Sequence, residues 1–165
     1  MGLSEDQERV ALQERELRLP GLDARFAWKL GVHMRTLAEE RGQAVVIDVR
    51  RFGQPLFYAA LEGTTPDHPE WVRRKCNVVA RFHRSSYAIG LKMKAKKETL
   101  TEQQGLPLAD YATDGGSFPL AVAGAGVVGC ATVSGLPERA DHELVVEALC
   151  AVLERDYAAL RLAAE

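Results

Sequence analysis

The residue with the clearest chemical potential in this sequence is Lys75, which falls within the apolar arc of a predicted helix. At 100° per residue, Val78 and Phe82 come to the same side of this helix as Lys75. A lysine in such a place extends to solvent, pairs with a carboxylate or contacts a ligand. The first two alternatives are structural, with Asp48 as the candidate partner. The third makes Lys75 and its neighbour Arg74 contacts for a carboxylate or a phosphate.

A second candidate site lies where a predicted strand passes through Ser134 and Gly135 towards a helix that carries Asp141 and His142. Exposed amides in front of a helix bind anions, because the helix dipole favours negative charge at that end. The same dipole lowers the pKa of a nearby histidine, and a neutral imidazole can bind a metal ion. The alternative is that Ser134 and Asp141 only satisfy unpaired amides at the helix start.

A third candidate is the pair Asp48 and Arg50, which share one face of a predicted strand. They form either a surface ion pair or the polar wall of a pocket. The histidines have no spacing typical of a metal site, and His68 and His83 are expected to be exposed. No Ser/His/Asp order is legible, so the sequence indicates no catalytic set and does not favour an enzyme.

Two β-hairpins are predicted to position these residues. Alternating apolar residues indicate one hairpin from the strands 44–52 and 56–61, and a second from 118–122 and 127–133. The turn of the second hairpin, 124–129, has the spacing GxGxxG. A dinucleotide site needs a helix after the third glycine, whereas a β-branched strand follows here. The glycines therefore predict a turn and no nucleotide site.

The remaining segments have helical periodicity or are ambiguous. Apolar residues alternate through 85–97 as in a strand, but Ser85 or Ser86 can cap a helix there, and we favour the helix. A short helical turn is expected at 108–111. Two antiparallel hairpins in one sheet, covered by helices, make an α+β domain. We divide the chain into an N-terminal acidic helix, residues 1–18, and an α+β domain, residues 19–165.

Composition restricts the class of protein. The chain has 165 residues, 47% of them hydrophobic, which suits one domain with its own core. A net charge of −2 does not draw the whole molecule to nucleic acid or to an anionic membrane. The charges of the segment 73–97 are all basic, but its arginines read as a solvated helix face, which disfavours nucleic-acid binding. The three cysteines form no pattern, and neither a signal peptide nor a membrane span is visible, so we expect a cytoplasmic protein.

The segment 115–149 resembles the signature of the GlcG/HbpS superfamily, the haem-degrading domain proteins. Paired glycines and a proline open a strand, a glycine hairpin follows, and a turn of the form V-S-G-x-P leads into the last helix. The segments 64–67, 71–75 and 82–87 are similar to the uncharacterised UPF0303 branch. The resemblance implies an antiparallel sheet of about five strands flanked by helices, as in the C-terminal domain of PduO-type proteins. It also implies symmetric oligomers, and some superfamily members bind haem or iron.

These observations lead to three hypotheses. The first is a cytoplasmic small-molecule-binding protein that holds haem or a related anionic cofactor and forms a symmetric homo-oligomer. The alternative is a non-catalytic interaction or scaffold protein, whose basic helix and acidic N-terminal helix can pair between subunits. An enzyme acting on haem comes third, because no general acid, base or nucleophile is legible. The predicted ligand-binding residues are Asp48, Arg50, Arg74, Lys75, Ser134, Gly135, Asp141 and His142.

Overall fold

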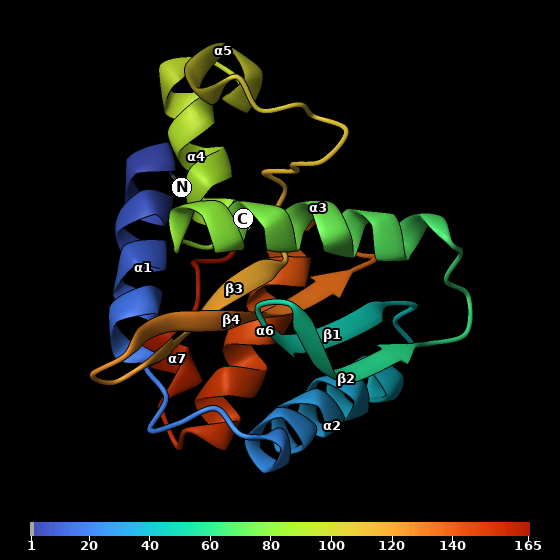
Figure 1. Ribbon diagram of the computed structural model, residues 1–165. Helices are drawn as coiled ribbons and strands as arrows, with labels where there is room; N and C mark the ends of the chain where they lie inside the picture. Colours follow the sequence, from blue (N-terminus) through green and yellow to red (C-terminus); the bar gives the residue numbers. More distant parts are fainter. Residues whose placement is uncertain (1) are drawn as a thin grey trace.

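The computed structural model describes residues 2–165, which form a four-stranded sheet with helices on both faces (Figure 1). The helices are α1 (Leu3–Glu16), α2 (Ala24–Glu40), α3 (Asp67–Phe82), α4 (Ser86–Lys96), α5 (Leu100–Gln104), α6 (Glu138–Val152) and α7 (Tyr157–Leu160). The strands are β1 (Val46–Arg51), β2 (Gln54–Ala60), β3 (Ser117–Val122) and β4 (Gly126–Ser134). None of the helices within residues 2–165 combines the length and the apolar composition needed to cross a bilayer.

The sheet is antiparallel throughout, with the strand order β2-β1-β4-β3. The two predicted hairpins are confirmed, and β1 joins them by pairing with β4, where Val46 lies opposite Ser134. The expectation of about five strands is wrong. Leu19 makes only an isolated parallel bridge with Val122 at the outer edge of β3. Pro20 follows and has no backbone N–H to donate, so this contact does not extend into a fifth strand.

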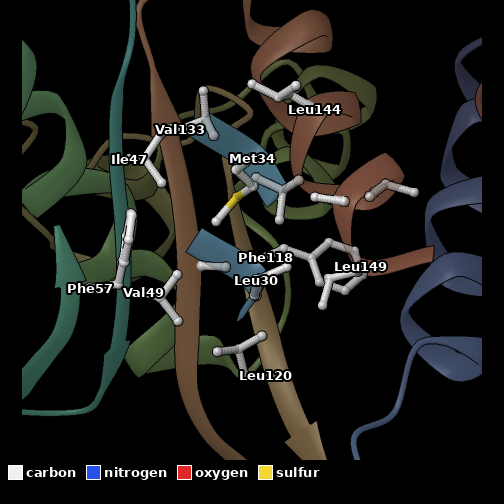
Figure 2. Packing of buried hydrophobic residues seen from close by; sticks show 14 of the residues in the cluster. Leu30, Met34, Ile47, Val49, Phe57, Phe118, Leu120, Val133, Leu144 and Leu149 are labelled. Atoms are coloured by element: carbon white, nitrogen blue, oxygen red, sulfur yellow. The ribbon is translucent and has the colours of Figure 1, made fainter. Parts of the chain in front are cut away.

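The main core lies between the sheet and the helices α2 and α6 (Figure 2). Because side chains alternate along a strand, Ile47 and Val49 of β1 enter this core, whereas Val46 and Asp48 point to the opposite face. That opposite face is covered by α3, which packs mainly against β4. The strand β1 is therefore buried on both faces, and polar side chains directed at α3 must find partners within the protein.

The ambiguous segment after α3 is the helix α4, as favoured by the sequence. Ser85 is its N-cap, and its hydroxyl accepts a hydrogen bond from the amide of Ala88 at 3.1 Å. At 108–111, where the sequence predicts a short helical turn, the chain forms no helix. It forms a single turn, in which the carbonyl of Pro107 accepts hydrogen bonds from the amides of Asp110 and Tyr111. The helix in this region is α5, whose capping box of Thr99 and Glu102 is a legible start signal.

The N-terminal helix α1 packs on the same chain. Val10 is buried against Tyr87 and Leu91 of α4, and Glu14 forms a 2.5 Å ion pair with Arg84. The pairing of acidic and basic segments that we expected between subunits therefore occurs at this contact within one chain.

Candidate functional site

Lys75 forms a buried ion pair with Asp141. Its Nζ lies 2.9 Å from Asp141 Oδ2 and donates to the carbonyl of Val133 at 3.3 Å, and only 3% and 2% of the two side chains are exposed. The prediction that Lys75 pairs with Asp48 is wrong, because Arg50 donates hydrogen bonds to both oxygens of the Asp48 carboxylate. Helix α3 instead places Lys75 over the end of β4, where α6 begins.

Asp141 also closes the junction between β4 and α6. Its carboxylate accepts hydrogen bonds from the amides of Leu136 at 2.9 Å and Gly135 at 3.4 Å. The sequence predicts that these amides bind an anion. In the structure the carboxylate of Asp141 accepts their hydrogen bonds instead. Burial raises the pKa of Asp141 above its ordinary value, while the charge of Lys75 opposes that shift. The geometry therefore agrees with the capping alternative.

Glycine is required on both sides of this ion pair. At Gly116, where φ is 142°, an added Cβ would lie 2.3 Å from the carbonyl of Val133 and 2.7 Å from Lys75 Nζ. At Gly135, where φ is 146°, it would lie 2.3 Å from the carbonyl of Ala44. The glycines of the family-like signature thus serve close backbone approach around Lys75.

A small pocket opens beside the ion pair, with a volume of about 130 Å³. Ligand pockets are commonly about 300–1,000 Å³, so this one admits only a molecule of a few heavy atoms. Its lining residues are Trp71, Lys75, Asp114, Leu136, Glu138 and Asp141. Three carboxylates and one ammonium give the lining a negative balance, which opposes an anionic ligand. A tetrapyrrole does not fit here.

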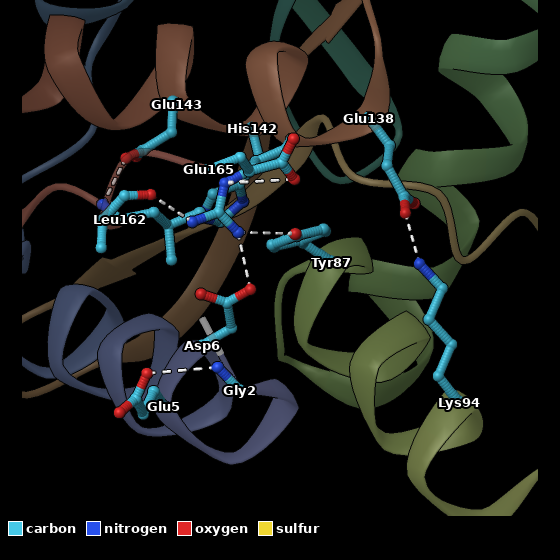
Figure 3. A network of polar contacts seen from close by, with 12 residues as sticks. Gly2, Glu5, Asp6, Tyr87, Lys94, Glu138, His142, Glu143, Leu162 and Glu165 are labelled. Atoms are coloured by element: carbon cyan, nitrogen blue, oxygen red, sulfur yellow. Dashed lines mark hydrogen bonds and ion pairs between the residues drawn. The ribbon is translucent and has the colours of Figure 1, made fainter.

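His142 does not belong to this pocket, although it follows Asp141 directly. Figure 3 shows it among the polar contacts where α6 meets α1 and α4. Its Nε2 donates to Gln13 Oε1 at 2.7 Å, and its ring lies 5.0 Å from Tyr87 and 5.8 Å from Phe118. Burial, with a smaller contribution from Arg139, lowers the pKa of His142 to about 3, so the imidazole is neutral at physiological pH.

The other predicted residues also lie apart. Arg74 donates to the carbonyl of Leu108 and lies over the ring of Trp71, 4.6 Å from its centroid. Arg50 binds both oxygens of the fully buried Asp48 at 2.7 Å, and these hydrogen bonds raise the pKa of the guanidinium. Of the eight predicted residues, the structure brings together Lys75, Gly135 and Asp141, with Ser134 next to them at the end of β4.

A larger concave site, which sequence reasoning missed, lies along the outer side of α1. This open groove, the His83 groove, has a volume of about 320 Å³ and is bounded by α1, the α3–α4 junction and the hairpin of β3 and β4. Pro119, Ala121 and Val127 form its apolar floor, and the polar residues on its walls are Glu14, Arg15, Arg18, His83 and Arg84.

His83 is presented by the end of α3. It is the C-cap of that helix with φ at 55°, a left-handed conformation in which histidine is enriched among non-glycine residues. Its exposed ring stacks on Phe52 with 6.2 Å between centroids and 10° between planes. The only sequence signal for this arrangement was a histidine in a basic run between two helices, since the walls of the groove come from remote segments.

The charge of the groove is positive. Arg84 is neutralised by Glu14, but within residues 2–165 neither Arg15 nor Arg18 has an ion-pair partner. Two exposed guanidiniums and one imidazole therefore surround an apolar floor. This arrangement suits a flat apolar molecule that carries carboxylates.

Comparison with known proteins gives consistent matches. The family model described as haem degrading protein HbpS-like matches residues 22–150. A UPF0303 protein of Acidobacterium capsulatum is 60% identical over 162 residues, covering 98% of each chain. The crystal structure of Ybr137w has a TM-score of 0.84 at 26% identity, covering 92% of this chain and 93% of that one. The PduOC:heme complex has a TM-score of 0.65 at 15% identity, covering 79% and 94%, and shows likeness of fold alone.

Proposed function

Because this chain belongs to the HbpS-like family of haem-degrading proteins, we propose that it binds haem, or a related carboxylate-bearing tetrapyrrole, in the His83 groove. The observation that carries this proposal is an exposed imidazole above an apolar strand surface, beside two guanidiniums that have no ion-pair partner within residues 2–165. The PduOC:heme complex supports it, since a protein of similar fold binds haem.

The residues of the groove fit the chemistry of haem. Histidine commonly holds haem iron in proteins, and His83 would be the residue that holds it in this groove. Arg15 and Arg18 supply guanidiniums for two propionate carboxylates, and Val127 with its neighbours supplies an apolar surface for one face of the macrocycle. When bound, the haem supplies a redox-active iron centre. The groove is open, and a groove of this size leaves part of the ligand exposed.

We place binding ahead of catalysis. The groove contains one carboxylate, Glu14, and that group is held by Arg84 and by the backbone amide of Ser85. No second carboxylate lines this groove in the part of the chain that the structure describes. The groove therefore offers no pair of free carboxylates for general acid–base catalysis.

The prediction that Lys75 and the β4–α6 junction bind an anion stays a prediction. The volume of about 130 Å³ and the nearby Asp114 and Glu138 restrict it to a very small ligand. The two sites can be separated by experiment, because they share no lining residue.

Titration of the purified protein with haemin tests the proposal. We expect a saturable Soret shift at one haemin per chain. His83→Ala should weaken binding about tenfold or more, because it removes the imidazole that would hold the iron. His68→Ala is the matched control, since His68 lies on the far end of α3 and should leave the affinity unchanged. Arg15→Ala combined with Arg18→Ala should weaken binding several-fold. A saturable shift that Lys75→Met abolishes and His83→Ala spares would contradict the proposed site.

A second candidate function is self-association. Trp28 of α2 is 64% exposed and contacts the ring of Phe57 in β2, the outermost strand on one side of the sheet, and Tyr58 of the same strand is 50% exposed. Val32 lies one turn from Trp28 and is also exposed. Exposed aromatic side chains next to an open sheet edge are typical of a surface that another chain covers. We propose a second copy of this chain as that partner.

A further inference from the structure

Two of the three cysteines lie together beneath α3, next to Lys75, but neither lines the pocket beside Lys75 or the His83 groove. Cys76 of α3 and Cys130 of β4 belong to one small cluster with Val46, Val72 and Val79, between α3 and the sheet. Both thiols are buried and reduced, and the thiol of Cys76 lies 3.2 Å from the hydroxyl of Thr132.

The surroundings make the two thiols unequal. Interaction with Cys130 lowers the pKa of Cys76 below its ordinary value, although burial opposes that shift. Interaction with Cys76, followed by burial, raises the pKa of Cys130 well above its ordinary value. The charges that act on Cys76 come from Asp48, which raises its pKa, and from Arg50, which lowers it. Because the thiolate is the nucleophile, Cys76 is the more reactive member of the pair.

Of the two thiols, Cys76 is the one closer to solvent. Cys76 is 6% exposed, while Cys130 is fully buried. Arg50 lies opposite Cys130 in the pairing of β1 with β4, and 27% of its side chain reaches solvent. A molecule as small as hydrogen peroxide can therefore approach Cys76 first, and Cys130 is placed to react with the product.

We propose that Cys76 and Cys130 form a reversible intramolecular disulfide when a hydroperoxide oxidises Cys76. The Cys76 thiolate attacks one peroxide oxygen, an S–O bond forms, the O–O bond breaks, and the leaving hydroxide takes a proton to become water. Cys130 then attacks the sulfenic sulfur of Cys76, so that an S–S bond forms and the S–O bond breaks. The second hydroxide leaves as water with the proton of Cys130. Two thiols are thus oxidised by two electrons, and one peroxide is reduced to two waters.

The position of the pair gives the disulfide a structural effect. It would link α3 to β4 beside Lys75, whose ammonium contacts the carbonyl of Val133 on the same strand. Oxidation therefore fixes the helix that carries both Lys75 and, at its end, His83.

Thiol mapping of the wild-type protein tests this proposal without any ligand. The protein is treated with hydrogen peroxide, denatured, alkylated with N-ethylmaleimide, digested and analysed by mass spectrometry. We expect a linked peptide joining Cys76 to Cys130 that dithiothreitol reverses, while Cys150 stays alkylated. Equal alkylation of all three cysteines after treatment would overturn the proposal, as would oxidation of Cys76 to sulfinic acid without linkage.

Two variants sharpen the result. In Cys130→Ser the sulfenic acid of Cys76 has no thiol partner, so labelling with dimedone should rise at least several-fold over the wild type. In Cys150→Ser, the matched control, the Cys76–Cys130 linkage should form as in the wild type. Dimedone labelling of Cys76 that is equal in the wild type and in Cys130→Ser would show that Cys130 does not resolve the intermediate. Should Cys130→Ser fail to fold, the wild-type map alone decides.

Discussion

At the scale of single residues, the Lys75–Asp141 ion pair shows how one buried charge organises its surroundings. Each charge is almost fully removed from water, and the two are held by one another and by the backbone of the β4–α6 junction. A buried ion pair adds little net stability compared with apolar residues. Loss of one partner, however, leaves the other charge buried without a counterion. Removal of either Lys75 or Asp141 alone is therefore expected to lower the free energy of unfolding.

Asp141→Asn should lower the free energy of unfolding by about 3–5 kcal/mol, because Lys75 would remain charged and buried without its counterion. Urea denaturation measures this loss. The control Glu39→Gln breaks the exposed pair with Arg35 and should cost less than about 1 kcal/mol. Equal losses in the two variants would show that the buried pair has no special role. Adding Lys75→Met to Asp141→Asn should recover part of the loss.

His142 predicts a pH dependence of stability. Its pKa is lowered to about 3 in the folded chain, against about 6.5 in an unfolded one. The unfolded state therefore binds more protons between these values, so the stabilisation is complete above about pH 6.5 and is lost as the pH falls towards 3. The contribution of this residue falls by about 1.4 kcal/mol per pH unit at most.

Comparison of the wild type with His142→Gln isolates this contribution from that of the carboxylates. Urea denaturation at several pH values should give a shallower acid loss for His142→Gln, whereas His68→Gln should follow the wild type. Parallel pH profiles for the wild type and His142→Gln would mean that the buried imidazole does not titrate as its environment indicates.

At the scale of elements, the sequence predicted local structure better than pairing. Period-two alternation marked both hairpins, and Ser85 marked the start of α4, because these signals are local. The pairing of β1 with β4 joins residues from opposite halves of the chain, and no local pattern specifies it. Lys75 and Asp141 were both candidates, but their contact depends on that pairing. His83 was set aside as exposed because its groove is built by α1 and the β3–β4 hairpin.

The packing of α2 on β2 supplies a test at this scale. An added Cβ at Gly31 would lie 2.3 Å from the ring of Phe57, and the rigid ring cannot move aside without displacing the helix. Gly31→Ala should therefore cost about 1–3 kcal/mol of stability, measured by urea denaturation. At Gly21 an added Cβ meets nothing within 4 Å, so Gly21→Ala should stay within about 0.5 kcal/mol of the wild type. Similar values for both would contradict this close contact.

At the scale of the whole molecule, the two ends of the chain are fastened to each other and to α6. Arg139 binds Asp6 of α1 at 2.6 Å and the carbonyl of Ala163 near the C-terminus at 2.6 Å. Gln13 of α1 donates to the carbonyl of Leu160 at 2.9 Å. The terminal segments thus close over one side of the molecule and leave the edge of β2 as the exposed side of the sheet.

Self-association through the α2–β2 surface is testable on the intact chain. Trp28→Glu should shift the sedimentation-equilibrium mass from a multiple of 18.1 kDa towards that of a single chain. The reason is that a charge would replace an aromatic side chain that the second copy would cover. Leu108→Glu, at a residue that is 50% exposed elsewhere, should leave the mass unchanged. A mass that neither substitution alters would exclude this surface.

The strand order has a consequence for how the protein is made. The two central strands, β1 and β4, are separated by β2, α3, α4, α5 and β3 in the chain. During translation the edge of β1 that pairs with β4 stays unpaired until β4 leaves the ribosome. Folds with such non-local pairing have high contact order, fold slowly and are exposed to aggregation meanwhile. We therefore expect the newly made amino-terminal half to aggregate more readily than the complete chain.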